Sequence, residues 1–415
     1  MRALVLGGAC AMGRWVVRDL TESDGVEEVA VADADSSSAF ETAGWAAVRS
    51  GAKGTASVRG LVVDATDGAA MRGAFERVDV VCNCAGEATN LEVMLACADT
   101  GTHYVDLGGG FQTTRDQLAL HHRFLSAQLT AVIGMGASPG TSNVMAALAA
   151  AELDTVDSVE ISLGRTELAT GSATLPAPDE IGTLLDQVSG PAVTYSDGAF
   201  VEVPAMSGQE DLELPAPVGS VRVGHSPHAA VATLPLSLAS KGVRTVSCKL
   251  GFGRRLMDRM DLLMGLGLAS TSPLELDGTP VIPRDLLVSC IRAAEELRGV
   301  EAAPEDAMVI SVRASGMRAR AQAGERLPAE VLAECVVRPH AGWLASAGLL
   351  GGSAPASIAA QFLAHKVVDV PGVLPPEQAI PTDPYFDELA RRGVEVSLTT
   401  RRPAVGGRAA ERKLA

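Results

Sequence analysis

The sequence is poor in aromatic residues and has no long uninterrupted apolar run. Only 3% of its 415 residues are aromatic, so side chains on which nucleic-acid bases could stack are scarce. Acidic residues outnumber basic ones by 50 to 34, and the net charge of -16 repels phosphate backbones. A membrane span needs about 20 apolar residues, whereas the first apolar run stops at Leu6. We therefore expect a cytoplasmic protein with neither nucleic acid nor membrane as its partner.

Disulfide and metal signatures are also missing. The seven cysteines are an odd number scattered through apolar surroundings, which is not a disulfide framework. Cys82 and Cys84 lack C-x-x-C spacing, and we expect buried apolar cysteines rather than metal ligands. The sequence contains no H-E-x-x-H or P-loop motif, so zinc hydrolysis and NTP hydrolysis are poorly supported. We expect no metal site.

The first 33 residues carry the clearest signal that is present. Residues 2–6 form a short apolar run, a glycine turn follows over residues 7–13, and residues 12–20 have helical spacing. Residues 29–33 read as a second buried strand that ends in an acid. This order is typical of a dinucleotide-binding βαβ unit. The turn supplies the candidate contacts to the pyrophosphate, namely Gly7, Gly8, Cys10, Ala11, Met12 and Gly13.

Two residues of this unit bear on the choice and affinity of the cofactor. An acid at the end of the second strand binds the adenosine ribose hydroxyls and repels a 2′-phosphate, so Asp33 favours NAD, with NADP as the alternative because of the serines at 36–38. Cys10 stands where G-x-G-x-x-G has its middle glycine. Its Cβ predicts weaker dinucleotide affinity or a slightly displaced phosphate.

The alternation of strands and helices continues after Asp33. Further strands are expected at 61–64, 78–82, 103–107 and 130–133, with helices at 68–75 and 112–128. We therefore predict an α/β fold, a Rossmann-type doubly wound parallel sheet, followed by a second α+β domain. In such a sheet ligands lie outside the carboxyl ends of the strands. These ends carry the further candidates Asp64, Asn83, Ala85, Gly86 and Asp106.

The texture of the sequence changes after a turn at 134–143 and an alanine-rich helix at 144–152. From residue 156 it has β-type alternation with many Gly and Pro residues, and strands are expected at 199–203, 244–250, 307–312 and 332–337. A helical pattern returns at 355–364. We predict a nucleotide-binding domain over 1–140, a substrate and dimerisation domain over 141–345, C-terminal helices over 346–400 and a loose tail over 401–415.

Several separated stretches resemble the saccharopine dehydrogenase family, including lysine 6-dehydrogenase and saccharopine reductase-like members. They are VLGGACAMGR (5–14), VVCNCA (80–85), ACADTGTHYVDL (96–107), GASPGTSNVMA (136–146), GPAVTYSDGAFVEVPAMSG (190–208), HAAVATLP (228–235), PGVLPPE (371–377) and FDELARRGVEV (386–396). Family members look as if they carry glycine in place of Cys10 and an H-S-E triplet in place of the run 228–230. The missing carboxylate removes one candidate ligand for a substrate amine.

The resemblance implies C-terminal helices that pack back on the nucleotide domain, a homodimer, and hydride transfer between nicotinamide and a C–N carbon of an amino-acid-like substrate. Asn83, Ala85 and Gly86 would line the nicotinamide half of the site. Asp106 could bind a ribose or the substrate amine, and His228 is the candidate for proton transfer or for binding a substrate carboxylate. A satisfied structural histidine is an equal alternative for His228. A dinucleotide-binding sensor or accessory protein without catalysis is the alternative function.

Overall fold

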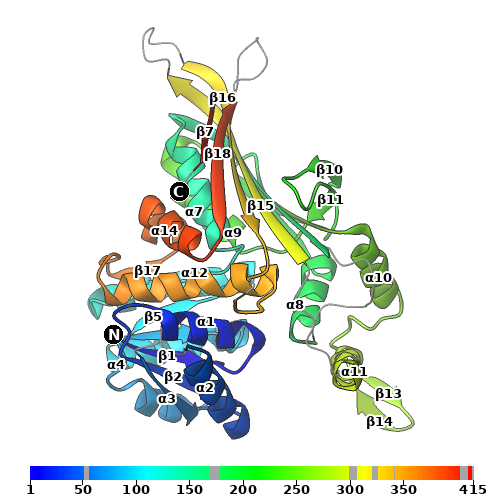
Figure 1. The fold of residues 1–415 in the computed structure, drawn as a ribbon. Helices are drawn as coiled ribbons and strands as arrows, with labels where there is room; N and C mark the ends of the chain where they lie inside the picture. The colour runs from blue at the N-terminus through cyan, green and yellow to red at the C-terminus, as the bar shows by residue number, and fades with distance from the viewer. Residues whose placement is uncertain are drawn as a thin grey trace.

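The computed structural model describes residues 1–50, 56–167, 178–298, 306–319, 326–340, 342–401 and 410–413. Two large sheets organise these residues. The predicted α/β fold with a Rossmann-type parallel sheet and a second α+β domain is confirmed. Figure 1 shows the first sheet with its helices in blue and cyan, and the second sheet extending from it in green, yellow and red.

The first sheet contains seven described strands in the order β17-β6-β5-β4-β1-β2-β3, and every pairing is parallel. Its central strands are runs of valine, alanine and leucine that are buried on both faces, as a covered parallel sheet requires. The strands are β1 (Arg2–Leu6), β2 (Glu28–Asp33), β3 (Ser57–Val62), β4 (Val80–Asn83), β5 (His103–Asp106), β6 (Thr130–Val132) and β17 (Gly372–Leu374).

Helices cover both faces of this sheet. One buried cluster joins Val5 and Val31 to Trp15 on the first helix, and the other joins Leu4 and Ala30 to Phe75 on the third. Side chains alternate across a strand, so successive residues of β1 enter opposite cores. The helices are α1 (Ala11–Glu22), α2 (Ser36–Ser50), α3 (Gly68–Phe75), the 3₁₀ turn η1 (Glu87–Thr89), α4 (Asn90–Thr100), α5 (Phe111–Ala119) and α6 (His121–Ser126).

The second sheet is mixed, and ten of its strands are described. Eight follow the order β10-β11-β12-β7-β15-β16-β18-β19, while β8 pairs with β12 and β9. They are β7 (Thr155–Glu167), β8 (Ala192–Ser196), β9 (Ala199–Val203), β10 (Glu210–Glu213), β11 (Ser220–His225), β12 (Thr245–Phe252), β15 (Asp306–Ala319), β16 (Arg326–Val337), β18 (Glu395–Arg401) and β19 (Ala410–Lys413). A separate hairpin joins β13 (Leu274–Leu276) and β14 (Thr279–Val281).

The remaining helices connect the two sheets or flank the second one. They are α7 (Thr141–Ala151), α8 (Pro178–Ser189), α9 (Ala230–Ser237), η2 (Ala239–Lys241), α10 (Arg254–Gly265), α11 (Pro283–Arg298), α12 (Ala347–Ala364), α13 (Pro376–Ala379) and α14 (Thr382–Arg391). Figure 1 shows α10, α11 and the β13–β14 hairpin together on one side of the molecule.

Helix α12 lies between the two domains and packs on both. Figure 1 shows it between the first sheet and the second. Gly352 faces the Met12 side chain on α1, and Gly351 faces Met308 on β15; an added Cβ would come within 2.8 Å and 2.3 Å of the methyl carbons. By length and composition α12 is apolar enough to cross a membrane, but 78% of it is buried inside the protein. It has the burial of a core helix.

Some element boundaries differ from those predicted. The third strand ends at Val62 rather than residue 64, α12 begins at Ala347 rather than 355, and the helix expected over 112–128 divides at Leu120. The tail expected to be loose contains β19, which pairs with β18; residues 402–409 and 414–415 lie outside the described range. The C-terminal segment supplies β17 to the first sheet and β18 to the second. The predicted domain boundaries stay a prediction.

Candidate active site

The glycine turn packs tightly between β1, α1 and the turn after β4. A Cβ on Gly13 would lie 2.2 Å from the Gly7 carbonyl oxygen, and one on Gly7 would lie 2.6 Å from the Ala85 nitrogen. Gly7 also has a φ of +69°, which favours glycine. These contacts bring the start of α1 and residue 85 together. The amides of Ala11 and Met12, in the first turn of the helix, precede its first backbone hydrogen bond, from Arg14 N to Cys10 O at 3.1 Å. They suit a pyrophosphate.

Cys10 is the N-cap of α1. Its Sγ accepts a hydrogen bond from Gly13 N at 3.2 Å and lies 3.5 Å from the Cys84 carbonyl oxygen. The thiol therefore points toward the glycine turn and occupies the Gly13 N–H group. A glycine at position 10 would leave this N–H group free to bind a ligand. The predicted loss of dinucleotide affinity stays a prediction, and the cap gives it a physical cause.

Asp33 ends β2 directly beside the turn. One carboxylate oxygen accepts from Ala9 N at 3.2 Å and the other from Asp35 N at 3.2 Å. Asp35 itself accepts from Ser38 N at 2.7 Å, and the hydrogen bonds from Ser38 lower the pKa of Asp35. Two carboxylates thus stand at the end of β2, where a 2′-phosphate would add a third negative group.

The other acidic candidate in this half of the sheet is less engaged with the turn. Asp64 is exposed beyond β3 and accepts hydrogen bonds from Thr66 N and Oγ1 at 2.8 Å and 2.7 Å, which lower its pKa. Asp64 thus closes its own turn. A contact with the cofactor stays a prediction.

The predicted nicotinamide-side residues have different environments. Asn83 is 2% exposed; its Nδ2 donates to Thr89 and Asn90, and its Oδ1 accepts from Ala85 N at 3.1 Å. Ala85 and Gly86 are exposed at the carboxyl end of β4. Asn83 is therefore placed to shape the turn, while Ala85 and Gly86 are placed to meet a ligand.

Asp106 is enclosed by hydrogen-bond donors. It is 1% exposed, and its carboxylate accepts hydrogen bonds from Gly134 N (2.7 Å), Gly108 N (2.8 Å), Tyr104 OH (2.8 Å) and Gln117 Nε2. Burial raises the pKa of Asp106, and these donors oppose the rise. We therefore read Asp106 as a residue that fastens the turns after β5 and β6, rather than as one that contacts a substrate amine.

His228 is half-buried opposite the turn that follows β6. Its Nε2 lies 2.7 Å from Ser138 Oγ, and its Nδ1 accepts a hydrogen bond from Ala230 N at 3.1 Å. Burial lowers the pKa of His228 from 6.5 to about 4, so the ring is neutral near pH 7. With Nδ1 acting as the acceptor, Nε2 carries the proton and donates to Ser138. Direct proton transfer by His228 stays a prediction that this geometry does not favour.

Ser138 begins a chain of hydrogen bonds that the sequence did not single out. Ser138 Oγ donates to Ser142 Oγ at 2.9 Å, Ser142 Oγ donates to Asn143 Oδ1 at 3.3 Å, and Asn143 Nδ2 donates to Glu377 Oε2 at 2.8 Å. We call these residues, together with His228, the His228–Glu377 chain. Its members come from the stretches 136–146, 228–235 and 371–377, which carried the family resemblance. Their shared membership of these stretches was the signal in the sequence that could have identified them.

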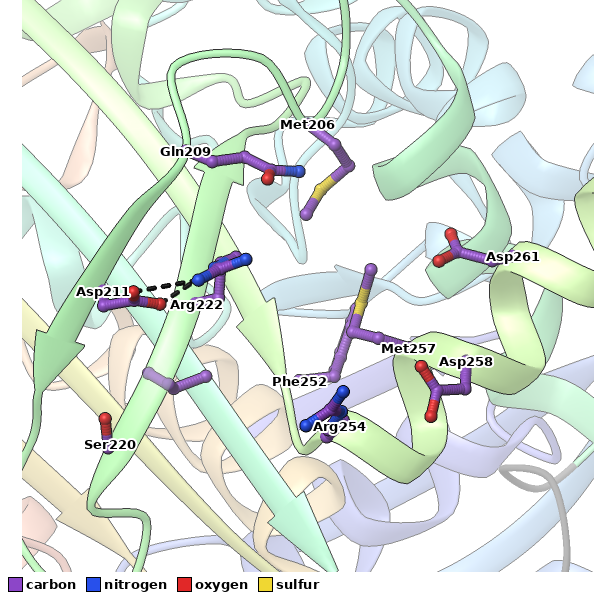
Figure 2. Close-up of a pocket in the computed structure, with 11 residues that line it drawn as sticks. Met206, Gln209, Asp211, Ser220, Arg222, Phe252, Arg254, Met257, Asp258 and Asp261 are labelled. Carbon is purple, nitrogen blue, oxygen red and sulfur yellow. Dashed lines mark hydrogen bonds and ion pairs between the residues drawn. The ribbon is translucent and has the colours of Figure 1, made fainter.

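A separate cavity of about 620 Å³ lies between the β10–β11 hairpin, the end of β12 and α10. Figure 2 shows Met206, Met257 and Phe252 at its centre, with the Arg222–Asp211 ion pair on one side and Asp258 and Asp261 on α10 on the other. None of the residues predicted to bind cofactor or substrate lines it. Across the described ranges, no three His, Cys, Asp or Glu side chains are grouped closely enough to hold a metal ion.

Fold and turn together define a dinucleotide-binding α/β protein, and comparisons with known proteins specify its family. Residues 3–132 match the family model described as the saccharopine dehydrogenase NADP binding domain. This part of the chain is similar to that family, so the resemblance predicted from the sequence is confirmed. The family description supports a nicotinamide dinucleotide and favours NADP, whereas Asp33 and Asp35 favour NAD.

Two curated relatives are carboxynorspermidine synthases. The protein of Vibrio alginolyticus is 26% identical and that of Vibrio cholerae 28% identical, each over 224 residues. The match covers 50% of this chain and spans about half the length of the relatives, 52%. Apo saccharopine dehydrogenase (L-Glu forming) of Saccharomyces cerevisiae superposes with a TM-score of 0.69 at 16% identity, over 96% of this chain and 99% of that one. The last likeness shows the fold.

Proposed function

We propose that the protein is an NAD(P)-dependent oxidoreductase that transfers a hydride between nicotinamide and a carbon bonded to nitrogen in an amino-acid-like substrate. The glycine turn carries this proposal, because the Ala11 and Met12 amides start α1 at the edge where β1 and β4 end. The relatives named for saccharopine and carboxynorspermidine support the C–N class. The bound dinucleotide supplies a hydride acceptor or donor.

The chain's own residues supply binding and orientation. The first turn of α1 would hold the pyrophosphate, while Ala85 and Gly86, exposed beyond β4, border the nicotinamide half. Asp106 fixes the turns after β5 and β6 through its four donors. The second of these turns presents Ser138 at the same edge of the sheet.

We propose NAD as the preferred form, against the description of the family model. Asp33 is held beside the glycine turn by Ala9 N, and Asp35 follows it at the start of α2. A 2′-phosphate at this position would meet both carboxylates, and like charges at such separations repel.

A non-catalytic dinucleotide-binding sensor is the second candidate. One observation favours it: His228 uses both ring nitrogens and Asp106 accepts four hydrogen bonds, so both predicted catalytic residues are already engaged within the protein. The oxidoreductase turns over an amine substrate, whereas the sensor binds the dinucleotide without turnover.

The deciding experiment follows the absorbance of NADH while L-lysine, saccharopine or carboxynorspermidine is oxidised by the purified protein, with NAD⁺ and NADP⁺ compared. An oxidoreductase of this class forms reduced dinucleotide with at least one of these amines. Tight binding of the dinucleotide without turnover of any of them would favour the sensor.

The homodimer expected from the resemblance stays a proposal. Exposed leucines on one side of the second domain support it, because large apolar side chains in a group mark interaction surfaces. They are Leu262 on α10, Leu266 directly after it, Leu274 and Leu276 on β13, and Leu286 on α11. Light scattering of the purified protein measures the oligomeric state.

A further inference from the structure

We infer that Ser138 contacts the substrate nitrogen, and that the His228–Glu377 chain holds its hydroxyl oxygen as a hydrogen-bond acceptor for a substrate N–H group. This inference deepens the proposed function and rests on it. It assigns a substrate-binding role to a serine and positioning roles to Asn143 and Glu377.

The direction of every hydrogen bond in the chain is fixed by the chemistry of its members. Nδ1 of His228 accepts from Ala230 N, so the ring proton sits on Nε2 and points at Ser138 Oγ. At the other end the Glu377 side chain accepts from Asn143 Nδ2 at 2.8 Å and from Ser237 Oγ at 2.9 Å. Donors therefore run in one direction, from the imidazole to the carboxylate.

Asn143 fixes the polarity in the middle of the chain. Its Nδ2 also contacts Thr233 Oγ1 at 3.3 Å, while its Oδ1 accepts from Gly140 N at 3.3 Å and from Ser142 Oγ. A flipped amide would direct N–H groups at a backbone N–H and turn an oxygen toward the Glu377 carboxylate. The observed orientation thus forces the Ser142 hydroxyl to donate to Asn143 and leaves its oxygen as the acceptor for Ser138.

Ser138 is consequently left with acceptor capacity. Its proton is committed to Ser142, and one lone pair receives the His228 N–H. A hydroxyl oxygen has two lone pairs, so one remains beside the two hydrogen bonds that the Ser138 hydroxyl makes to described residues. The Ser138 backbone makes a further hydrogen bond to His228. A chain of aligned donors that ends on a carboxylate also polarises each member. Ser138 Oγ therefore suits an amine or ammonium N–H.

The position of Ser138 agrees with this role. It is half-buried in the turn after β6, beside Pro139, whose ring packs 2.9 Å from a Cβ placed on Gly108 after β5. Both turns are tied to the Asp106 carboxylate, through Gly134 N and Gly108 N. In a parallel sheet, ligands lie at this carboxyl edge.

The chain ends on a carboxylate that comes from another part of the sequence than the one the family resemblance indicated. Ala230 stands in place of the acid of the H-S-E pattern, and Glu377 on α13 meets α9 from another part of the sequence through Ser237. Burial raises the pKa of Glu377, against the hydrogen bonds from Asn143, Thr233 and Ser237. Its role is to orient the chain; it does not touch Ser138.

The reaction that this arrangement serves is balanced without proton transfer to Ser138. Oxidation removes a hydride from the carbon beside nitrogen, which passes to bound NAD(P)⁺, and a proton from nitrogen, which passes to water. A C=N bond forms, and water then adds and releases a carbonyl compound and an amine. Ser138 accepts a hydrogen bond from the substrate nitrogen and so orients it.

The test measures kcat, KM and dinucleotide affinity for wild type, Ser138→Ala, Ser138→Thr and Glu377→Gln, with L-lysine, saccharopine and carboxynorspermidine as the amines. Loss of one hydrogen bond to the substrate in Ser138→Ala raises KM or lowers kcat/KM about tenfold to a hundredfold. NADH affinity stays within about twofold of wild type. Ser138→Thr retains most activity, and Glu377→Gln shows a smaller loss in the same direction.

A second measurement is independent of turnover. The ¹⁵N spectrum of histidine-labelled protein reports which ring nitrogen of His228 is protonated, with His228→Gln to assign its signals. We expect protonation at Nε2. Protonation at Nδ1 reverses the chain and overturns the inference.

The kinetic outcomes separate the two proposals. If wild type oxidises an amine and Ser138→Ala has unchanged kinetics, the inference is wrong and the proposed function stands. If Ser138→Ala loses NADH affinity by the same factor as kcat/KM, Ser138 has a structural role, and this result also overturns the inference. Oxidation of none of the three amines with either dinucleotide contradicts both.

Discussion

Cys10 and Asp33 flank the same glycine turn. The Cys10 thiol occupies a backbone amide that a pyrophosphate could otherwise use, and the Asp33 carboxylate repels a 2′-phosphate. Cys10 Sγ takes the Gly13 N–H, and Asp33 is held by Ala9 N. The sequence predicted the positions of both, because the order of strand, turn, helix and acid is local. It did not predict the cap, which depends on the rotamer of the thiol.

Asp33 is expected to set the choice between NADH and NADPH. Wild type should bind NADH more tightly, and Asp33→Asn, which keeps an acceptor but removes the charge, should narrow the gap by roughly tenfold, or about 1.4 kcal/mol. Calorimetric titration with both dinucleotides measures this. An unchanged ratio in Asp33→Asn would show that another group makes the selection.

His228 predicts a pH dependence of stability. Burial lowers its pKa from 6.5 to about 4. As the pH falls, the imidazole is therefore protonated near pH 6.5 in the unfolded chain but only near pH 4 in the folded protein. The stability is fully present above pH 6.5 and is lost as the pH falls toward 4, by about 1–3 kcal/mol. Urea unfolding of wild type and His228→Gln across this range gives the difference; parallel curves would contradict it.

Asp106 shows what residue-scale reasoning misses. Its position at the end of β5 follows from the strand pattern, and this led to a substrate-binding prediction. Its donors Gly134 and Gln117 come from later turns and helices, so its enclosure depends on tertiary contacts that no local pattern contains. Glu377 was not predicted as a site residue because its partners also come from distant parts of the sequence.

The elements of the first sheet show why some patterns predict structure well. β1 and β2 are runs rich in valine, alanine or leucine, and β5 centres on the buried Tyr104 and Val105; all three lie within a residue of their predicted ranges. By contrast, β17 has three residues and joins the sheet only through its pairing with β6. Helix α2 went unpredicted because its apolar spacing is diluted by alanine and serine.

Gly13 on α1 packs against the glycine turn whereas Gly44 on α2 has open space beside it, so substitutions at the two positions should have opposite effects. Gly13→Ala places a Cβ 2.2 Å from a backbone oxygen, whereas a Cβ on Gly44 in α2 meets nothing within 4 Å. Gly13→Ala should cost at least about 2 kcal/mol and abolish NADH binding. Gly44→Ala should stabilise the protein by about 1 kcal/mol. Chemical denaturation compares both, and equal effects would contradict the packing.

At the scale of the whole molecule, the C-terminal segment joins the two domains. Arg392, beyond α14, pairs with Asp19 on α1: its Nε lies 2.9 Å from both carboxylate oxygens, and the side chains are 9% and 5% exposed. Burial alone would lower the pKa of Arg392, but Asp19 and Glu388 raise it overall. The two partners lie far apart in sequence, so no local pattern indicated the pair.

Breaking this pair should be costly. Asp19→Ala leaves the buried Arg392 guanidinium with Glu388 as its remaining carboxylate among the described residues. It is expected to lower the free energy of unfolding by about 3 kcal/mol. Adding Arg392→Leu should restore much of the loss. Asp211→Ala, which removes an exposed ion pair with Arg222, serves as the control and should change little. Similar losses from both single variants would contradict a buried link between the domains.

The most direct test is a titration of the purified protein with NADH and NADPH, followed by tryptophan fluorescence and by calorimetry. Trp45 on α2 and Trp343 before α12 cluster around Trp15 on α1, with ring centroids 5.4 Å and 6.1 Å from that of Trp15. Tryptophan emission therefore reports the helix that starts at the glycine turn. We predict saturable binding that is tighter for NADH, and tighter still in Cys10→Gly. Binding of neither dinucleotide, by wild type or by Cys10→Gly, would contradict a dinucleotide-dependent function.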